Sequence, residues 1–528
     1  MALLDERPQA DLHSFGYRQQ LERQVGSFAS FAVGFSFVSI LTTVFQLFGL
    51  GFGFGGTAFF WTWPAVFVGQ LLVALCFSEL AARYPLSGAI YQWSRRLGGA
   101  VVGWFAGWTM IIAQVVTLAS AAIALQVVLP VIWPGFQLIG TESGLDTVSG
   151  ASNAVLLGVV LLALTTALNA ASVRMTAIAS SVGVVCELVG VALVVALLFE
   201  HAERGPSVVL HTTNLNAQTG YLGPLLVSAL MAAYVLVGFD SAGELSEETR
   251  NPRRIAPRTI LRAVIVSGFG GALLILAALM AAPSVTDGKL ASGGLPYVLT
   301  SRLGTVPGRL LLIDVAIAIF VCTLAIQTSA SRMIFSMGRD RVLPWSDRFA
   351  AVSRRTGTPV VPTVVAGVVA AALLVINIGN PALFLALTSV CIMLMYVAYL
   401  MVTVPMLIAR LRGRYAEATQ TDETGQPLFS LGRWGLPVNA LAVVYGLVMA
   451  INLGWPRAEV FDPEGGHWYL RFLGPLALGA TALLGLLCYL AQRRDYHATI
   501  TGSLPLTGRP VFAGAQLLDS QARLGEEA

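Results

Sequence analysis

Long apolar stretches constrain this chain more than any other feature of its sequence. A helix of about 20 apolar residues crosses the ~30 Å hydrocarbon core of a bilayer, and the backbone is satisfied in lipid only within helices or closed barrels. We therefore predict an all-α membrane protein with twelve transmembrane helices, at residues 26–49, 57–81, 100–130, 153–172, 175–199, 223–246, 260–282, 307–336, 361–378, 382–409, 435–453 and 468–492.

Composition supports this reading. Of the 528 residues, 56% are apolar and 11% are charged, whereas soluble domains carry about 25% charged residues. These values exclude a water-soluble enzyme, a nucleic-acid-binding protein and a disordered scaffold. The expected surroundings are a lipid bilayer, and no nucleic acid is expected as a partner.

The placement of basic residues predicts the orientation. With a cytoplasmic N-terminus, the inward-facing segments hold 26 of the 32 basic residues and the outward loops hold six. Because basic residues concentrate on the cytoplasmic side, both termini are predicted to be cytoplasmic. The simplest location is a multi-pass protein of the plasma (cell inner) membrane.

Cysteine and histidine patterns offer no catalytic or metal chemistry. The five cysteines lie in apolar runs without CxxC spacing, and none of the five histidines lies in an apolar run, so a cofactor, a metal or an enzymatic nucleophile–base pair is not expected. Residues 51–56 fit GxGxxG, but we place them in an outer loop with no preceding strand. They do not predict a dinucleotide site.

The sixth apolar run carries unusual residues in its inner half, namely Gly238, Asp240, Ser241 and Gly243. A glycine costs about 1 kcal/mol in a helix interior, and an ionised aspartate near mid-bilayer costs ~2.5–3.5 kcal/mol. A broken helix that restarts near Ser241 accounts for both, with Ser241 and Glu244 spaced as a capping box. Its freed backbone groups would face a cavity. The alternative is a kinked packing helix capped by Asp240.

The first apolar run is rich in hydroxyl side chains, and it contains no proline. Such hydroxyls can bond back to their own helix, so packing alone explains them equally well. Residues 34–36 (GFS) resemble residues 238–240 (GFD). This pairing indicates a five-helix repeat whose second copy is inverted.

A few ionisable residues lie within the predicted spans. Glu187, in the middle of the fifth run, is expected to be either a proton carrier or an amine contact, the alternative being a neutral carboxyl bonded to a neighbouring helix. Asp314 is expected to pair with a group at a helix interface. Glu79 and Arg332 are expected to anchor a gate or a loop. Without intramembrane histidines, proton coupling falls on Glu187, Asp240 or, as a weaker choice, Asp314.

Three segments point to one family: SELAARYPLSGAIYQW (78–93), GFDSAGELSEETRNPRRIAP (238–257) and SRMIFSMGRDRVLP (331–344). They resemble the amino acid–polyamine–organocation transporters, and within them the amino acid/choline transporter branch. The resemblance implies a LeuT-like fold of two inverted five-helix repeats, at 26–199 and 223–409, followed by two further helices at 435–492. Tails at 1–25 and 493–528 flank this unit.

The resemblance also implies a central substrate site where the first and sixth helices are broken. The candidate substrate-binding residues are Ser36, Phe37, Val38, Ser39, Ile40, Val237, Gly238, Phe239, Asp240, Ser241, Thr323 and Gln327. Glu187 and Asp240 are the candidate coupling or cation-contacting residues.

Two departures from the family pattern bear on the substrate. Many amino-acid members have a GSGIF-like run at the first break, where this chain reads FSFVSIL, and many sodium-independent members have a lysine that aligns with Glu187. Both departures favour amine-bearing or quaternary substrates. Phe37 and Phe239 are candidates for a cation–π face.

The sequence therefore predicts a secondary active transporter for a small amine-containing solute, such as an amino acid, GABA, a polyamine or choline, that works by alternating access. Proton symport, exchange and the oligomeric state stay open. The alternative is a non-transporting membrane nutrient sensor of the same fold. A channel is disfavoured because no filter-like repeat or charged ring occurs.

Overall fold

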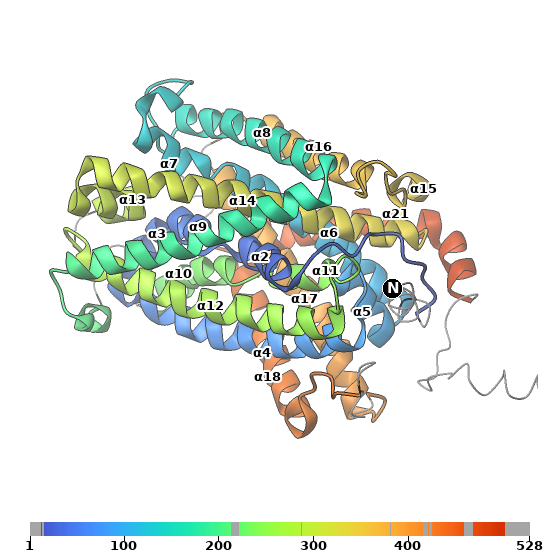
Figure 1. Cartoon of the computed structure of the whole chain (residues 1–528). Coiled ribbons are helices and arrows are strands. Elements are labelled where there is room, and N and C mark those ends of the chain that lie inside the picture. Colours follow the sequence, from blue (N-terminus) through green and yellow to red (C-terminus); the bar gives the residue numbers. More distant parts are fainter. Residues whose placement is uncertain are drawn as a thin grey trace, which may run out of the picture.

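The computed structural model describes residues 12, 15–212, 221–286, 288–380, 382–415, 421, 425–458 and 468–501. Within these residues the protein is all-helical, and the only β-type pairings are the isolated bridges Val25–Thr249 and Thr421–Pro427. The long helices lie side by side with their axes roughly aligned (Figure 1).

The helices follow the apolar runs of the sequence, because each run can satisfy its backbone groups internally. The α-helices are α2 (Ser27–Val38), α3 (Ile40–Gly55), α4 (Thr62–Arg83), α5 (Ala89–Gly98), α6 (Ala100–Ala122), α7 (Leu125–Ile132), α8 (Val148–Ala171), α9 (Val173–Glu200), α10 (Leu222–Val235), α11 (Ser241–Glu244), α12 (Pro252–Ala281), α13 (Lys289–Leu303), α14 (Thr305–Arg339), α15 (Ser346–Phe349), α16 (Val360–Ile376), α17 (Leu383–Leu411), α18 (Gly435–Gly454), α20 (Trp468–Arg471) and α21 (Leu473–Thr501). Short 3₁₀ turns are η2 (Gly56–Trp61), η3 (Pro134–Phe136), η4 (Pro206–Leu210) and η5 (Gly432–Trp434).

Many of these helices are built to face lipid. Nine helical stretches in the described residues are long and apolar enough to cross a membrane, and α10 and α16 are shorter apolar helices. Large apolar side chains line the outer faces, such as Val182 and Val189 of α9, which are 59% and 61% exposed. An apolar surface of this kind belongs against lipid. The chain is therefore a multi-span helical membrane protein.

Two helices are interrupted inside the bundle. The first break is the single residue Ser39, whose φ of 36° separates α2 from α3. The second break is residues 236–240, between α10 and α11, where Gly238 has a φ of 88°. Figure 1 shows α2 and α11 among the surrounding helices rather than at the rim.

Both breaks lie in the buried core. The α2 helix packs on α9, α12 and α14, and α10 packs on α3, α4 and α17. Gly34 of α2 allows close approach to α11, since a Cβ there would lie 3.3 Å from the Ala242 Cβ. The fold thus places the two interrupted segments beside each other.

The predicted outer loop at residues 51–56 is wrong, because α3 continues as a helix to Gly55. The glycines serve packing here. A Cβ at Gly49 would overlap the backbone of Ala291, and one at Gly55 would lie 2.7 Å from Ser228 Oγ. Small residues therefore let α3 pack closely against α13 and α10. The amphipathic helix α5 and helix α13 lie outside the predicted spans.

Candidate substrate site at the interrupted helices

The first break is held by a carboxylate from α9. Ser39 Oγ donates to Glu187 Oε1 at 2.9 Å, and the backbone N–H of Leu41 donates to the same oxygen at 3.1 Å. Ser39 Oγ also lies 2.7 Å from Thr42 Oγ1 and caps α3 by accepting from the Thr42 N–H. Glu187 is 1% exposed. The carboxyl therefore completes the N-terminus of α3 inside the protein.

The second break depends on glycine and on a tyrosine from α17. The positive φ of Gly238 is a conformation that glycine adopts without a Cβ penalty. Its N–H donates to Tyr399 Oη at 2.9 Å, and the Tyr399 hydroxyl donates to Asp240 Oδ1. A Cβ at Gly238 would overlap the Phe37 ring. Phe37 of α2 therefore rests directly on the second break.

Several buried polar atoms near the breaks have no hydrogen-bond partner among the described residues. They are Ser36 Oγ, Gln114 Oε1, Asp240 Oδ2 and Ser241 Oγ. Buried polar groups in proteins are nearly always paired. These atoms are therefore candidates to bind a polar solute or water.

A second buried carboxyl lies one helical turn beyond Asp240. Glu244 Oε1 accepts from Gln114 Nε2 at 2.8 Å, and Glu244 Oε2 accepts from Ser329 Oγ. The spacing of four residues brings Asp240 and Glu244 to the same side of the chain. These bonds connect the second break to α6 and α14.

The predicted capping box at Ser241 is wrong. The helix does restart at Ser241, but no side chain caps it, and the Glu244 carboxyl is occupied by Gln114 and Ser329. Neighbouring helices compete successfully for this carboxylate because they supply two donors in a dry interior.

Aromatic rings enclose the second break on one side. The Phe239 ring lies 5.5 Å from the Tyr399 ring, and the Phe77 ring lies 5.0 Å from Tyr399 and 5.9 Å from Phe239. These spacings are typical of packed aromatic pairs. Phe239 is thus part of a rigid cluster that supports Asp240.

Some predicted site residues gather at the breaks and some do not. Residues 36–40 and 237–241 do, as does Glu187. Thr323 Oγ1 bonds back to Ile319 O of its own helix at 2.7 Å. Gln327 Nε2 donates to Thr166 Oγ1 at 2.5 Å and to Thr363 O at 3.2 Å. Gln327 therefore joins α14 to α8 and α16 rather than facing the breaks.

Other ionisable residues have structural positions. Asp314 lies next to Gly190 of α9, but its buried Oδ2 has no partner in the described part of the chain, so the predicted interface pairing is not found there. Glu79 pairs with Arg83 at 3.4 Å and with Arg410 of α17. Glu79 therefore anchors α4 to α17.

Sequence reasoning did not find Tyr399, Gln114 and Ser329. Each is a polar side chain inside an apolar run, which was the available signal. What the sequence does not contain is the pairing between helices, since these residues meet the second break from α17, α6 and α14.

Ion pairs close one end of the bundle, which we call the arginine-rich end. Arg332 Nε donates to Glu248 at 2.7 Å, Arg339 Nη1 donates to Glu247 at 2.7 Å, and Arg95 pairs with Asp340. All six side chains are at most 8% exposed. The pairs link the segment after α11 and the α5 helix to the end of α14.

The segment before α2 also covers the arginine-rich end. Tyr17 Oη donates to Asp340 Oδ2 at 3.0 Å, and the Arg339 guanidinium lies 4.1 Å from the Tyr17 ring centroid. Burial, and then the charge of Asp340, raises the pKa of Tyr17. The phenol therefore remains a donor at neutral pH.

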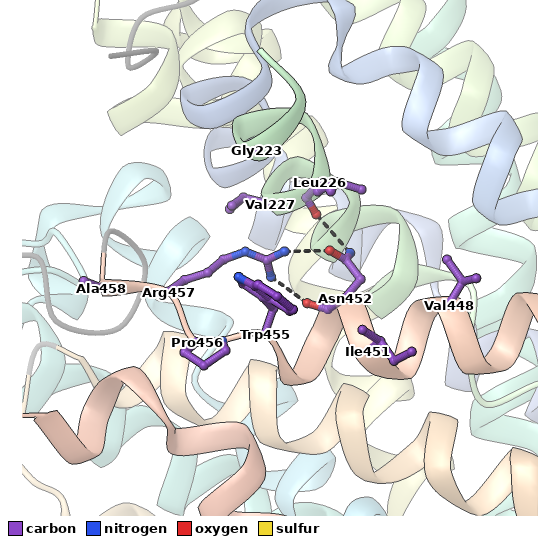
Figure 2. A pocket seen from close by; sticks show the side chains of 10 residues that line it. All are labelled: Gly223, Leu226, Val227, Val448, Ile451, Asn452, Trp455, Pro456, Arg457 and Ala458. Carbon is purple, nitrogen blue, oxygen red and sulfur yellow. Dashed lines mark hydrogen bonds between the residues drawn. The ribbon is translucent and has the colours of Figure 1, made fainter. Parts of the chain in front are cut away.

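A separate cavity of about 530 Å³ lies between the start of α10 and the end of α18. Figure 2 shows Arg457 donating to the backbone and side-chain oxygens of Asn452, at 2.7 and 2.6 Å, while Asn452 donates to Leu226 O at 3.1 Å. Leu226 is ten residues before the second break, roughly 15 Å along a helix. This cavity is therefore distinct from the breaks.

Two interrupted helices inside a multi-span bundle are the arrangement on which many membrane transporters build their substrate site. In the described residues no group of three His, Cys, Asp or Glu side chains is arranged to hold a metal ion.

The sequence profile of the amino acid permease family matches residues 25–478, and the chain belongs to that family. This places it among the amino acid–polyamine–organocation transporters, as the sequence motifs indicated.

Curated relatives agree with this assignment. The chain is 26% identical over 478 residues to amino-acid permease BAT1 of Arabidopsis thaliana, covering 86% of this chain and 90% of the relative. It is 23% identical over 481 residues to amino-acid permease 2 of Neurospora crassa, covering 87% and 83%. It is 25% identical over 346 residues to the low-affinity putrescine importer PlaP of Escherichia coli K12, covering 63% and 70%.

Proposed function

We propose that this permease is a secondary active transporter that moves a small amine-containing solute by alternating access. The observation that carries the proposal is Asp240 Oδ2, a buried carboxylate oxygen without a partner in the described residues, which lies at an interrupted helix. An ammonium group supplies the donor that this oxygen lacks. Freed backbone groups of the second break bind the remaining polar groups of the solute.

The candidate substrates are amino acids, GABA, polyamines and choline. The relatives named as amino-acid permeases and as a putrescine importer support the first and third classes. Their names also favour transport over the alternative of a non-transporting sensor. The neighbouring rings of Phe37 and Phe239 add a cation–π contact for the ammonium group.

For the transport cycle we propose two inverted repeats, residues 26–199 and 223–409, that rock against each other, with residues 435–492 as added helices. The tails at 1–25 and 493–528 face the cytoplasm of a cell whose plasma membrane holds the protein; residues 502–528 lie outside the described residues. Support comes from the two breaks, which fall at corresponding places in the two halves, and from the distribution of basic residues.

We assign the coupling of solute transport to its driving force to the two carboxyls at the breaks, Glu187 and Asp240. A carboxyl in a dry site takes up or releases a proton when the charges around it change. Proton symport predicts that an inward proton gradient drives accumulation of the solute. Exchange predicts that internal solute drives it instead.

Reconstituted vesicles test the proposal. Purified protein in proteoliposomes should take up at least one of labelled alanine, GABA, putrescine and choline, with either an imposed pH gradient or internal solute as the driving force. Asp240→Asn should reduce uptake of that solute by about tenfold or more, because one charge-assisted hydrogen bond contributes ~1.5–3 kcal/mol. If wild-type vesicles accumulate none of the four, the proposed function is wrong.

A further inference from the structure

The N-terminus of α3 is already occupied by a carboxyl group of the protein. Glu187 accepts from Ser39 Oγ and from the Leu41 N–H, at 2.9 and 3.1 Å. The first N–H groups of a helix have no partner within the helix and carry a partial positive charge, which favours a carboxylate. In transporters built on broken helices, such an N-terminus faces the anionic group of the substrate. Here the protein itself supplies that group.

This contact is sheltered from water. Glu187 is 1% exposed, and Ser39 and Leu41 are fully buried. A low dielectric strengthens both hydrogen bonds. A substrate carboxylate at the same helix end would find the Ser39 hydroxyl and the Leu41 N–H already taken by Glu187. A substrate carboxylate is therefore disfavoured at the first break.

The second break has the opposite need. Asp240 Oδ2 and Gln114 Oε1 are buried acceptors with no donor among the described residues. Glu244 adds another carboxyl one turn away. Arg332 is nearby, but its Nε and Nη2 donate to Glu248, at 2.7 and 3.2 Å, and its Nη1 donates to Ser331 at 2.8 Å. The second break therefore presents hydrogen-bond acceptors and negative charge, and a bound solute would have to supply hydrogen-bond donors and positive charge.

From these two observations we infer that Glu187 stands in for a substrate carboxylate, so that the site selects amines without a carboxylate. A short diamine is the best match, with one ammonium group on Asp240 and the other toward Glu244. Side chains four residues apart on a helix are ~5–6 Å apart at Cβ, which suits two ammonium groups joined by four methylenes. The inference rests on the proposed function and specifies its substrate class.

A matched pair of probes tests the selection. Putrescine and GABA have similar length, and they differ in that one ammonium group of putrescine is a carboxylate in GABA. In wild-type proteoliposomes, putrescine should compete with labelled putrescine at a concentration about tenfold lower than GABA or alanine. Equal or stronger competition by GABA or alanine overturns the inference.

A variant then tests the cause. Glu187→Ala frees the Leu41 N–H, so the ratio of GABA to putrescine affinity should rise by about tenfold. Asp314→Asn is the matched control: it removes a carboxyl next to α9, but one that makes no hydrogen bond to Leu41 in the described residues. Its GABA-to-putrescine ratio should stay as in the wild type.

The outcomes separate this inference from the proposed function. An unchanged ratio in Glu187→Ala, or an equal change in Asp314→Asn, contradicts the inference while transport of amines stands. Absence of uptake of every amine by the wild type overturns both. Should Glu187→Ala fail to fold, Glu187→Met keeps the approximate size of the side chain and removes both acceptor oxygens, and the same rise in ratio is expected of it.

Discussion

The two helix breaks differ in how their unpaired polar groups are satisfied. The first is one residue long, and a carboxylate of the chain, Glu187, satisfies the new helix end. The second is five residues long, and it leaves Asp240 Oδ2 without a partner in the described residues. One break is internally completed and the other is not. The comparison supports the proposal that the solute binds at the second break, where the carboxylate oxygen Asp240 Oδ2 has no partner in the described residues.

Among the variants considered, Gly238→Ala should reduce amine uptake most, because it distorts the second break. A Cβ at this position overlaps the Phe37 ring, and its φ of 88° costs a non-glycine residue ~1–2 kcal/mol. We expect amine uptake to fall by more than about 30-fold. Gly223→Ala is the control, because nothing lies within 4 Å of a Cβ there. Equal uptake by both variants would remove the second break from the site.

Tyr399→Phe has the next largest effect. It removes the acceptor of the Gly238 N–H and the donor to Asp240 at once, and a buried unpaired group costs ~1–3 kcal/mol. The apparent affinity for the transported amine should fall by about tenfold. Tyr396→Phe, one turn away and bonded to Tyr445 at 2.8 Å, should leave that affinity unchanged. A similar loss in both would assign the effect to packing of α17.

Ser39→Ala addresses the first break through stability. Loss of an N-cap side chain costs about 1 kcal/mol, and here it also removes one donor to Glu187. The apparent melting temperature in detergent should fall measurably. Ser36→Ala should not lower it, because the Ser36 hydroxyl has no partner in the described residues. If both serines behave alike, the first break is not held as the structure indicates.

Glu203→Gln tests a residue away from both breaks and should have the smallest effect. Glu203 is bound by Arg302 outside the membrane-spanning helices, and this contact lowers the pKa of Glu203. A lowered carboxyl pKa stabilises the fold above the unfolded-state value, about 4, and that contribution disappears as the pH falls through the folded-state value. Melting curves at several pH values should show a small wild-type advantage at neutral pH and none in acid. Uptake should be unchanged; a loss of uptake would place this pair in the transport cycle.

The sequence predicted the helical membrane architecture because the length of an apolar run is a local property. The orientation that the arginine placement indicates stays a prediction. The sequence also located the second break to within a few residues, since Gly238 and Asp240 are costly inside an apolar helix. The first break was predicted from the resemblance to a transporter family.

The parts that the sequence did not supply depend on contacts between distant segments. Gln327 stays a predicted substrate contact, and in the structure its Nε2 donates to Thr166 and to the backbone of Thr363. Glu244 has the spacing of a capping box, yet donors from α6 and α14 take its carboxyl. Residue spacing along the chain shows which side-chain hydrogen bonds could form. Which of them do form depends on the packing of the whole helix bundle.

The three ion pairs at the arginine-rich end have a consequence for how the bundle moves. A dry ion pair is costly to break because each partner would be left alone in a poor solvent, whereas a wet pair contributes ~0–1 kcal/mol. Once water reaches the first pair, its neighbours also become cheaper to separate. Under the proposed alternating access, hydration at this end should therefore behave as a threshold, so that the three pairs are either all formed or all separated.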